Sequence, residues 1–209
     1  MPQKNVYVIL RQWLQPWWRP ISKDASDVTT PDLVAQTPPA QSRGLTLHTT
    51  KAAIADFRKL QSLPELNSAW CYHDGAIHQV LAHLRADGRN DFPKEKRDDS
   101  ARQSFKPLIY PTNVKYDRTH LIPFGYHGKE DNPYLLIGWS NVDNQGLFAK
   151  FENKQSDRGV DLYWFTTVLK NDKGAVWAYA IYDARSKKFL DAMQSVAHGP
   201  FFWAPSLVR

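Results

Sequence analysis

Hydrophobic positions recur at helical spacing in the first half of the chain and at strand spacing in the second half. Within residues 51–63, apolar side chains recur about every three positions, and Thr50 just before them is suited to cap a helix N-terminus. Residues 75–86 also gather their large apolar side chains on one helical face. The pattern therefore predicts two helices in this part of the chain.

The second half of the chain alternates between apolar and polar residues and is rich in aromatic and β-branched residues. Residues 161–169 and 175–182 have this pattern and flank an Asn-Asp-Lys-Gly sequence, which predicts a β-hairpin. Residues 107–110 and 114–121 predict two earlier strands, and residues 140–155 predict a helix. Strand, strand, helix and hairpin in this order indicate an α+β fold.

Changes in composition divide the chain into four parts. Residues 1–21 form a Trp-rich head, and residues 22–43 are rich in Ser, Thr, Asp, Gln and Pro, which is typical of a flexible linker. Residues 44–104 form the predicted helical accessory region, of which residues 87–104 are a charged surface loop. Residues 105–209 contain the predicted strands and helix of the core.

The head carries Trp13, Trp17 and Trp18 between two arginines. Tryptophan beside arginine favours boundaries between apolar and wet surroundings, so the head could anchor the chain to a protein partner or to a membrane surface. A first strand or arm folded against the main body fits the same residues.

Composition favours a basic protein with a real hydrophobic core. The net charge of +6 favours polyanionic partners, and 42% hydrophobic residues are ample for a core. Cys71 is the only cysteine, which excludes an internal disulfide and a cysteine-based zinc cluster. The sequence contains neither a run of roughly 18 apolar residues nor a classical signal peptide, which slightly favours a cytoplasmic location.

Three residues have the chemistry that phosphodiester hydrolysis requires. His120 can accept a proton near neutral pH, and Asn144 offers a carbonyl oxygen of the kind that Mg²⁺ prefers. Glu152 lies eight residues after Asn144 in the predicted helix, so the two side chains are roughly 80° apart around a regular helix. Base and cation ligand in this order indicate a nuclease.

At these residues the chain resembles the DNA/RNA non-specific endonucleases of the ββα-metal, or His-Me finger, class. The family signature is Tyr-Asp-Arg-Gly-His-Leu, and residues 116–121 read Tyr-Asp-Arg-Thr-His-Leu. An Asn-Pro pair follows at residues 132–133, then Asn144, and then Glu152 at the family's eight-residue step. The resemblance covers residues 105–185, about half of the chain.

The resemblance implies a ββα-metal finger core with an antiparallel sheet. It implies that His120 is the general base, that Asn144 binds Mg²⁺ (with Mn²⁺ as an alternative), and that Glu152 holds the cation through water. Arg118 would stabilise the charge on the phosphate, and Asp117 would brace the strand. The expected reaction is weakly sequence-selective cleavage of DNA, with RNA as an alternative substrate.

Thr119 stands where the family has glycine. Because threonine is comfortable in a strand, we expect it to be accommodated there. Two alternatives to an active nuclease remain open. One is a nuclease-like nucleic-acid-binding protein whose catalysis Thr119 attenuates. The other is a toxin or restriction effector of a mobile element, whose Trp-rich head docks a partner.

Several further residues are candidates for contact with nucleic acid. His127 follows the motif in a glycine-flanked loop, where a role on the substrate side is favoured over a second metal site. Asn141 is a rival of Asn144 but is suited to capping the helix. The basic residues that could follow a phosphate backbone are Lys115, Lys150, Lys154 and Arg158.

Overall fold

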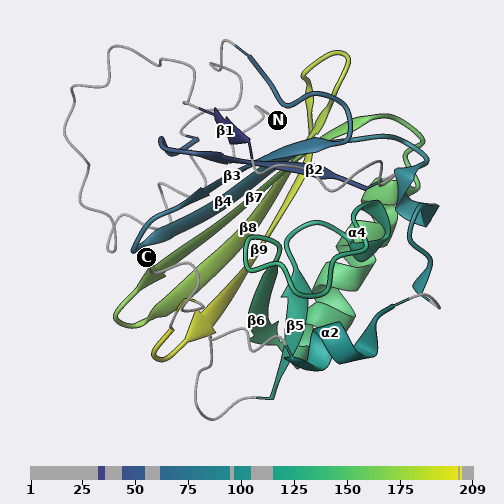
Figure 1. The fold of residues 1–209 in the computed structure, drawn as a ribbon. Helices are drawn as coiled ribbons and strands as arrows, with labels where there is room; N and C mark the ends of the chain where they lie inside the picture. The colour runs from purple at the N-terminus through teal and green to yellow at the C-terminus, as the bar shows by residue number, and fades with distance from the viewer. Residues whose placement is uncertain are drawn as a thin grey trace, which may run out of the picture.

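The fold is α+β, with one large mixed sheet, one small sheet and few helices (Figure 1). The computed structural model describes residues 33–35, 44–54, 62–94, 97–104, 115–201 and 203. The Trp-rich head, residues 1–21, and the strand predicted at 107–110 lie outside the described residues.

The large sheet has seven strands in the order β1-β2-β3-β4-β7-β8-β9. Only β2 and β3 pair in parallel, and all other neighbours in this sheet are antiparallel. The strands are β1 (Leu33–Ala35), β2 (Thr46–Thr50), β3 (Ser68–His73), β4 (Ile77–Leu84), β7 (Leu162–Asn171), β8 (Gly174–Asp183) and β9 (Phe189–His198).

The hairpin of β7 and β8 lies between β4 and β9 in the large sheet, and its turn is specified by its sequence. The Asn171 side chain accepts hydrogen bonds from the backbone N–H groups of Lys173 and Gly174, at 2.8 and 3.1 Å. Gly174 has φ of +155°, and a Cβ there would be 2.0 Å from the carbonyl oxygen of Ala197. Glycine is therefore required where the hairpin meets β9.

The small sheet pairs β5 (Tyr116–His120) with β6 (Leu136–Ser140), and a continuous helical segment follows it. The Ser140 hydroxyl caps this segment by accepting a hydrogen bond from the Asp143 N–H at 3.3 Å. The segment consists of α3 (Asn141–Asp143), the π-helical turn η5 (Asn144–Phe148) and α4 (Ala149–Ser156). The predicted helix at 140–155 is thus confirmed, with a π turn inside it.

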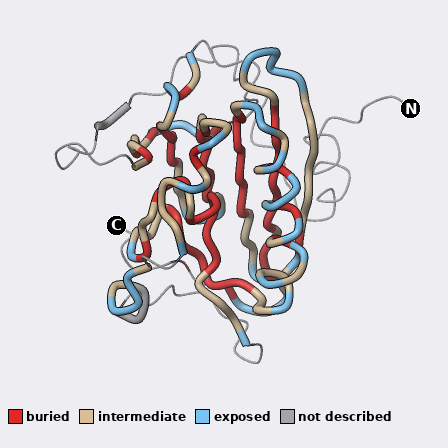
Figure 2. The backbone as a smooth tube through the Cα atoms, turned by 90° about the vertical axis from the view of Figure 1, so that its right-hand side faces the viewer, coloured by how far each residue is buried: buried red, intermediate tan, exposed pale blue. Residues whose placement is uncertain are grey.

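The core has two parts, one on each face of the large sheet. Alternate residues of β7 face opposite sides, so that Trp164 joins one hydrophobic cluster and Phe165 the other. The small sheet and α4 cover the face of Trp164 (Figure 1), where Phe151 stacks on Tyr179 with ring centroids 5.6 Å apart. Figure 2 shows that the buried stretches follow the strands.

The predicted helical accessory region is wrong over its described residues, because residues 44–104 supply three central strands. Residues 75–86 form the strand β4 with its flanking turns, paired with β3 on one side and β7 on the other. Val80, Leu81 and Ala82 are all buried, because the sheet is covered on both faces. A continuous apolar run of this kind fits a helix and a doubly buried strand equally well.

The other predictions for the first half also need correction. Lys51–Ile54 are not helical, and the remainder of that predicted helix lies mainly outside the described residues. The predicted linker contains β1, and the predicted charged loop contains η2 (Gly88–Asn90) and α2 (Asp99–Ser104). No described helix is long and apolar enough to span a membrane.

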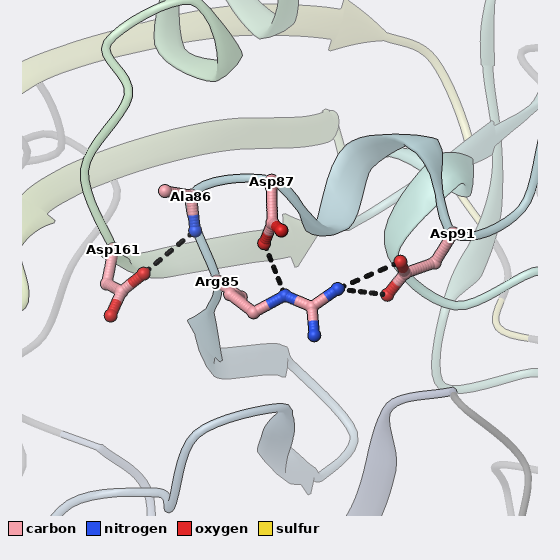
Figure 3. Close-up of polar contacts among 5 residues, drawn as sticks. All are labelled: Arg85, Ala86, Asp87, Asp91 and Asp161. Atoms are coloured by element: carbon pink, nitrogen blue, oxygen red, sulfur yellow. Dashed lines mark hydrogen bonds and ion pairs between the residues drawn. The ribbon is translucent and has the colours of Figure 1, made fainter.

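The segment that follows β4 is held in shape by ionic contacts within it and is joined to the start of β7 by a hydrogen bond (Figure 3). The Arg85 guanidinium pairs with Asp87 and donates to both carboxylate oxygens of Asp91, at 3.0 and 3.2 Å. The Ala86 N–H donates to the Asp161 carboxylate at 2.8 Å, beside the start of β7. These contacts orient the turn that leads to η2.

The same segment packs closely on η4 (Phe124–Tyr126), a 3-10 turn after β5. The Phe92 N–H donates to the carbonyl oxygen of Gly125 at 3.1 Å. A Cβ on Gly125 would lie 1.7 Å from the carbonyl oxygen of Arg89, so the two backbones are in direct contact. Because that atom belongs to the backbone, no side-chain rotation could relieve the clash.

We therefore expect Gly125→Ala to separate these two segments. The substitution should lower the free energy of unfolding by about 1–3 kcal/mol, as overpacking usually does, in urea denaturation followed by circular dichroism. The matched control is Gly75→Ala, since a Cβ on Gly75 meets nothing within 4 Å. Equal free energies of unfolding for the two variants would contradict the close contact.

Candidate functional site

A cleft of about 1000 Å³ opens between β5, the helical segment and the chain around residues 89–94 and 97. Its lining joins residues that are far apart in the sequence. His120, Asn144 and Glu152, the three residues singled out by the sequence, all line it. The other lining residues are Arg89, Asn90, Phe92, Pro93, Lys94, Arg97, Lys115, Tyr116, Asp117, Arg118, Pro123, Phe124, Gly125, Gln145, Ala149 and Asn153.

The Asp117 carboxylate binds the start of the helical segment to β5. Its two oxygens accept hydrogen bonds from the side-chain amides of Asn141, Asn144 and Gln145, at 2.9 to 3.1 Å. Burial raises the pKa of Asp117, but these three amides and the charge of Lys115 outweigh burial and hold the pKa below its usual value. Asp117 therefore braces the helix as well as the strand.

This carboxylate also orients the Asn144 side chain. An ionised carboxylate can only accept hydrogen bonds, so Asn144 must turn its NH₂ group toward Asp117. Its carbonyl oxygen then points away from Asp117 and can serve a ligand in the cleft. The Asn141 NH₂ group donates to both oxygens of Asp117, and Asn141 does not line the cleft. Asn141 is therefore not an alternative to Asn144 as a cation ligand.

The π turn at Asn144–Phe148 changes the relation between Asn144 and Glu152. A π turn has more residues per turn than an α-helix. The angle around the helix axis between the Asn144 and Glu152 side chains is therefore smaller than in a regular α-helix of the same length. Both side chains consequently line one cleft. The sequence analysis assumed a regular α-helix, because no residue of this segment predicts a π turn.

Glu152 is a partly buried carboxyl group in the cleft wall. The Tyr179 hydroxyl donates to its Oε1 at 3.3 Å. Burial raises the pKa of Glu152 to about 7, against the opposing effects of Tyr179 and of the positive charges of Arg89, Lys94 and Arg97. A carboxyl group of this kind gains more from a nearby cation than an exposed one does, because burial has removed much of its hydration.

His120 is the last residue of β5, and its side chain is about 10% exposed. Its Nε2 lies 3.1 Å from Oε2 of Glu130. Burial lowers the pKa of His120 below its usual value, while Glu130 acts in the opposite direction and Arg97 adds to the lowering. The ring is therefore neutral at pH 7, which is the form that can accept a proton.

Glu130 and Arg97 belong to the site although sequence reasoning missed them. The Glu130 side chain has no exposed surface, and its Oε1 lies 3.2 Å from the Arg97 Nε. The Arg97 guanidinium also lies over the Phe124 ring, 4.4 Å from its centroid. Both residues stand in charged stretches of sequence, which have the composition of surface loops, so no local signal sets them apart.

His127 does not face a substrate. It is 2% exposed, accepts a hydrogen bond from the Lys129 N–H at Nδ1, and donates from Nε2 to the carbonyl oxygen of Ile122. Burial holds its pKa well below the usual value, so it stays neutral. With both nitrogens engaged by backbone groups, His127 supports the loop beneath His120, whose ring centroid is 5.2 Å away.

The predicted phosphate-binding residues divide into two groups. Lys115 and Arg118 line the cleft, whereas Lys150, Lys154 and Arg158 do not. Lys154 and Arg158 instead pair with Asp191 of β9, at 2.8 and 3.5 Å. These latter two residues therefore attach α4 to the large sheet.

Three other basic residues line the cleft, whereas the predicted basic residues of α4 and its end do not. Arg89, Lys94 and Arg97 come from the segment that was predicted to be a charged surface loop. Together with Lys115 and Arg118 they face only two acidic lining residues, and the cleft is accordingly positive. A positive cleft concentrates anionic ligands.

Thr119 is 1% exposed and does not line the cleft. It lies between Arg118 and His120 in β5, where alternation turns its side chain to the opposite face of the strand. The strand accommodates it as expected, with Thr119 paired with Ile137 of β6.

No group of three or more His, Cys, Asp and Glu residues is placed to hold a metal within the described part of the chain. A cation site that consists of the Asn144 carbonyl oxygen and one carboxylate contains only one residue of these four kinds, so it is not a group of this sort. Comparison with protein-family models, with curated proteins and with solved structures found no match for this chain.

The raised pKa of Glu152 predicts a pH-dependent stability in the absence of metal. Because the folded protein holds this proton up to about pH 7 and the unfolded chain releases it near 4.5, stability should fall as pH rises between these values. Glu152→Gln cannot ionise, so in EDTA at pH 8 it should be about 1–3 kcal/mol more stable than the wild type, with no difference at pH 4.

Urea unfolding at several pH values measures this difference. Glu65→Gln is the matched control, since Glu65 is exposed and should leave the pH dependence unchanged. A wild type and a Glu152→Gln variant whose stabilities run parallel from pH 4 to 8 would show that burial does not perturb this carboxyl group.

Proposed function

We propose that this protein is a divalent-cation-dependent endonuclease that hydrolyses phosphodiester bonds in DNA, with RNA as an alternative substrate. The observation that carries the proposal is that His120, Asn144 and Glu152, from a strand and a helical segment, line one positive cleft. The cleft thus offers a neutral base, an oriented amide oxygen and a carboxylate, next to cations that suit a polyanion.

The arrangement of the elements supports membership of the ββα-metal class. In that class a two-stranded antiparallel unit is followed by a helix that carries the metal ligand. Here β5 pairs with β6, and the helical segment that begins at Asn141 follows directly. The proposed base, His120, lies at the end of β5, the first strand of this unit.

The residues present fit a Mg²⁺ ion. Mg²⁺ prefers oxygen ligands and retains most of its waters, so one amide oxygen and one nearby carboxylate are sufficient. Asn144 would bind the ion through the carbonyl oxygen that Asp117 directs away from itself, and Glu152 would hold it through an intervening water. The bound ion would supply positive charge to offset the charge developing on the phosphate.

The chain's own residues account for the remaining steps. His120 would accept a proton from the water that attacks phosphorus, while the bond from phosphorus to the 3′-oxygen breaks and that oxygen takes a proton from solvent water. Arg118 and the lysines of the cleft would hold the phosphate by charge, without reading base edges. Weak sequence selectivity is the expected consequence.

Conversion of supercoiled plasmid DNA to nicked and linear forms tests the proposal. The wild type should cut DNA in Mg²⁺ or Mn²⁺ and be inactive in EDTA. His120→Ala should reduce the rate about 10²- to 10⁴-fold, which is the usual contribution of a general base, and Asn144→Ala should abolish cutting at moderate Mg²⁺ concentrations.

His198→Ala is the matched control, because His198 is exposed on β9 and lies outside the cleft. It should cut like the wild type. Absence of cutting by the wild type in either metal would overturn the proposal. Binding of DNA without any cutting would instead favour the nuclease-like binding protein, and equal cutting by His120→Ala would remove the histidine from the mechanism.

The charges that line the cleft predict which lysines bind DNA. Lys94→Ala and Lys115→Ala should each weaken binding of DNA and reduce the slope of log K against log salt by about one, measured in EDTA to prevent cutting. Lys150→Ala should leave both unchanged, since Lys150 is exposed on α4 but does not line the cleft. A larger loss from Lys150→Ala would move the binding surface onto α4.

A further inference from the structure

Glu130 is a buried carboxyl group beside two residues of the cleft lining, His120 and Arg97, and the proposed reaction does not yet assign it a role. Its side chain has no exposed surface, and a cationic or potentially cationic group lies close to each of its oxygens. Oε2 lies 3.1 Å from the His120 Nε2, and Oε1 lies 3.2 Å from the Arg97 Nε. A carboxylate taken out of water in this way is costly unless its partners compensate it.

The chemistry of the contact assigns the proton on the His120 ring. The ring N–H is not aligned on Oε2 as a hydrogen bond. An ionised carboxylate nevertheless has acceptor sites only, so the 3.1 Å separation is attractive only with hydrogen on Nε2. In a neutral imidazole the other nitrogen, Nδ1, then carries a lone pair. His120 lines the cleft, and Nδ1 is the nitrogen that is left to act there.

Among the described residues, Glu130 and Arg97 are the ionised groups that act on His120. On the other sides of the ring are Phe124, with its centroid at 5.6 Å, and His127, at 5.2 Å. His127 is held neutral by burial and by its two backbone contacts, and Lys129 reaches His120 through its backbone. Glu130 is thus the group that offsets a positive charge on the His120 ring.

We propose that Glu130 is a positioning residue, which keeps the proton of neutral His120 on Nε2 and stabilises the imidazolium that forms when Nδ1 accepts a proton. Arg97 supplies the counter-charge that keeps the buried Glu130 ionised. Each turnover would move one proton from water to Nδ1, and His120 would then release a proton to solvent. The kinetic part of this inference rests on the proposed nuclease function, whereas the position of the proton does not.

The wild-type protein tests the position of the proton without any substitution. In ¹⁵N-labelled protein at a pH where His120 is neutral, the ring nitrogen shifts distinguish a protonated Nε2 from a protonated Nδ1. The His120 signals are identified by their absence in His120→Gln. Protonation on Nε2 is expected, and protonation on Nδ1 would overturn the inference.

Glu130→Gln tests the effect of the charge. Glutamine has nearly the same shape and still offers a carbonyl oxygen to Nε2, but it cannot offset a positive ring. The pKa of His120 should therefore fall further, and the acidic limb of the pH–rate profile should move to lower pH. We expect kcat to drop at least about tenfold, though less than in His120→Ala, with KM nearly unchanged.

Asp131→Asn is the matched control, because it removes the same charge from the neighbouring, exposed residue. It should change neither the ring shifts of His120 nor the pH–rate profile. A Glu130→Gln variant that folds and matches the wild type in ring shifts and kcat would overturn the role of Glu130. If Glu130→Gln does not fold, the ¹⁵N ring shifts of His120 in the wild type still show whether the proton is on Nε2.

The two proposals fail separately. A wild type that cuts no DNA overturns the nuclease function, and the ring shifts of His120 still report whether Glu130 holds the proton on Nε2. A wild type that cuts DNA with Nδ1 protonated retains the nuclease function and overturns the role of Glu130.

Discussion

The Asp117 carboxylate is the point on which the geometry of the cleft depends. It lies in β5, and it accepts hydrogen bonds from three side-chain amides at the start of the helical segment. Because a carboxylate only accepts, all three amides must present their NH₂ groups to it. One charged side chain thereby sets the direction of the Asn144 carbonyl oxygen and attaches the helix to the strand that carries His120.

Burial has different consequences for the acidic groups around this cleft. Asp117 has enough hydrogen-bond donors that its pKa is lowered, whereas Glu152 has one donor at 3.3 Å and a pKa raised to about 7. Glu130 is compensated by the Arg97 guanidinium on one side and by His120 on the other. Burial thus leaves Glu152 with little compensation from the protein itself, which is the condition that favours a cation beside it.

The sequence was sufficient for those parts of the structure that depend on local chemistry. The β7–β8 hairpin and the helix after Ser140 could be predicted, because a turn with Asn and Gly and a Ser cap are specified within a few residues. β4 could not, because a strand buried on both faces loses the alternation that identifies strands. Burial on both faces is decided by the whole fold.

The same distinction applies to the candidate site. The order and spacing of His120, Asn144 and Glu152 could be recognised in the sequence, and the structure brings all three to one cleft. Glu130 could not be recognised, since a glutamate between a lysine and an aspartate has the composition of a surface loop. Its burial depends on Arg97, which is distant in the sequence, so only the fold could reveal the pair.

The segment after β4 shows why the first half of the chain matters to the cleft. Arg89, Lys94 and Arg97 supply the cationic wall that faces β5 and the helical segment, and Arg97 also compensates Glu130. The direction of this segment is set by Arg85, by the Ala86 contact with Asp161, and by the close approach of Arg89 to Gly125. The strands that extend the large sheet therefore do more than enlarge the core. They carry one wall of the cleft, and without it the base, the amide and the carboxylate would lie on an open surface where solvent screens their charges.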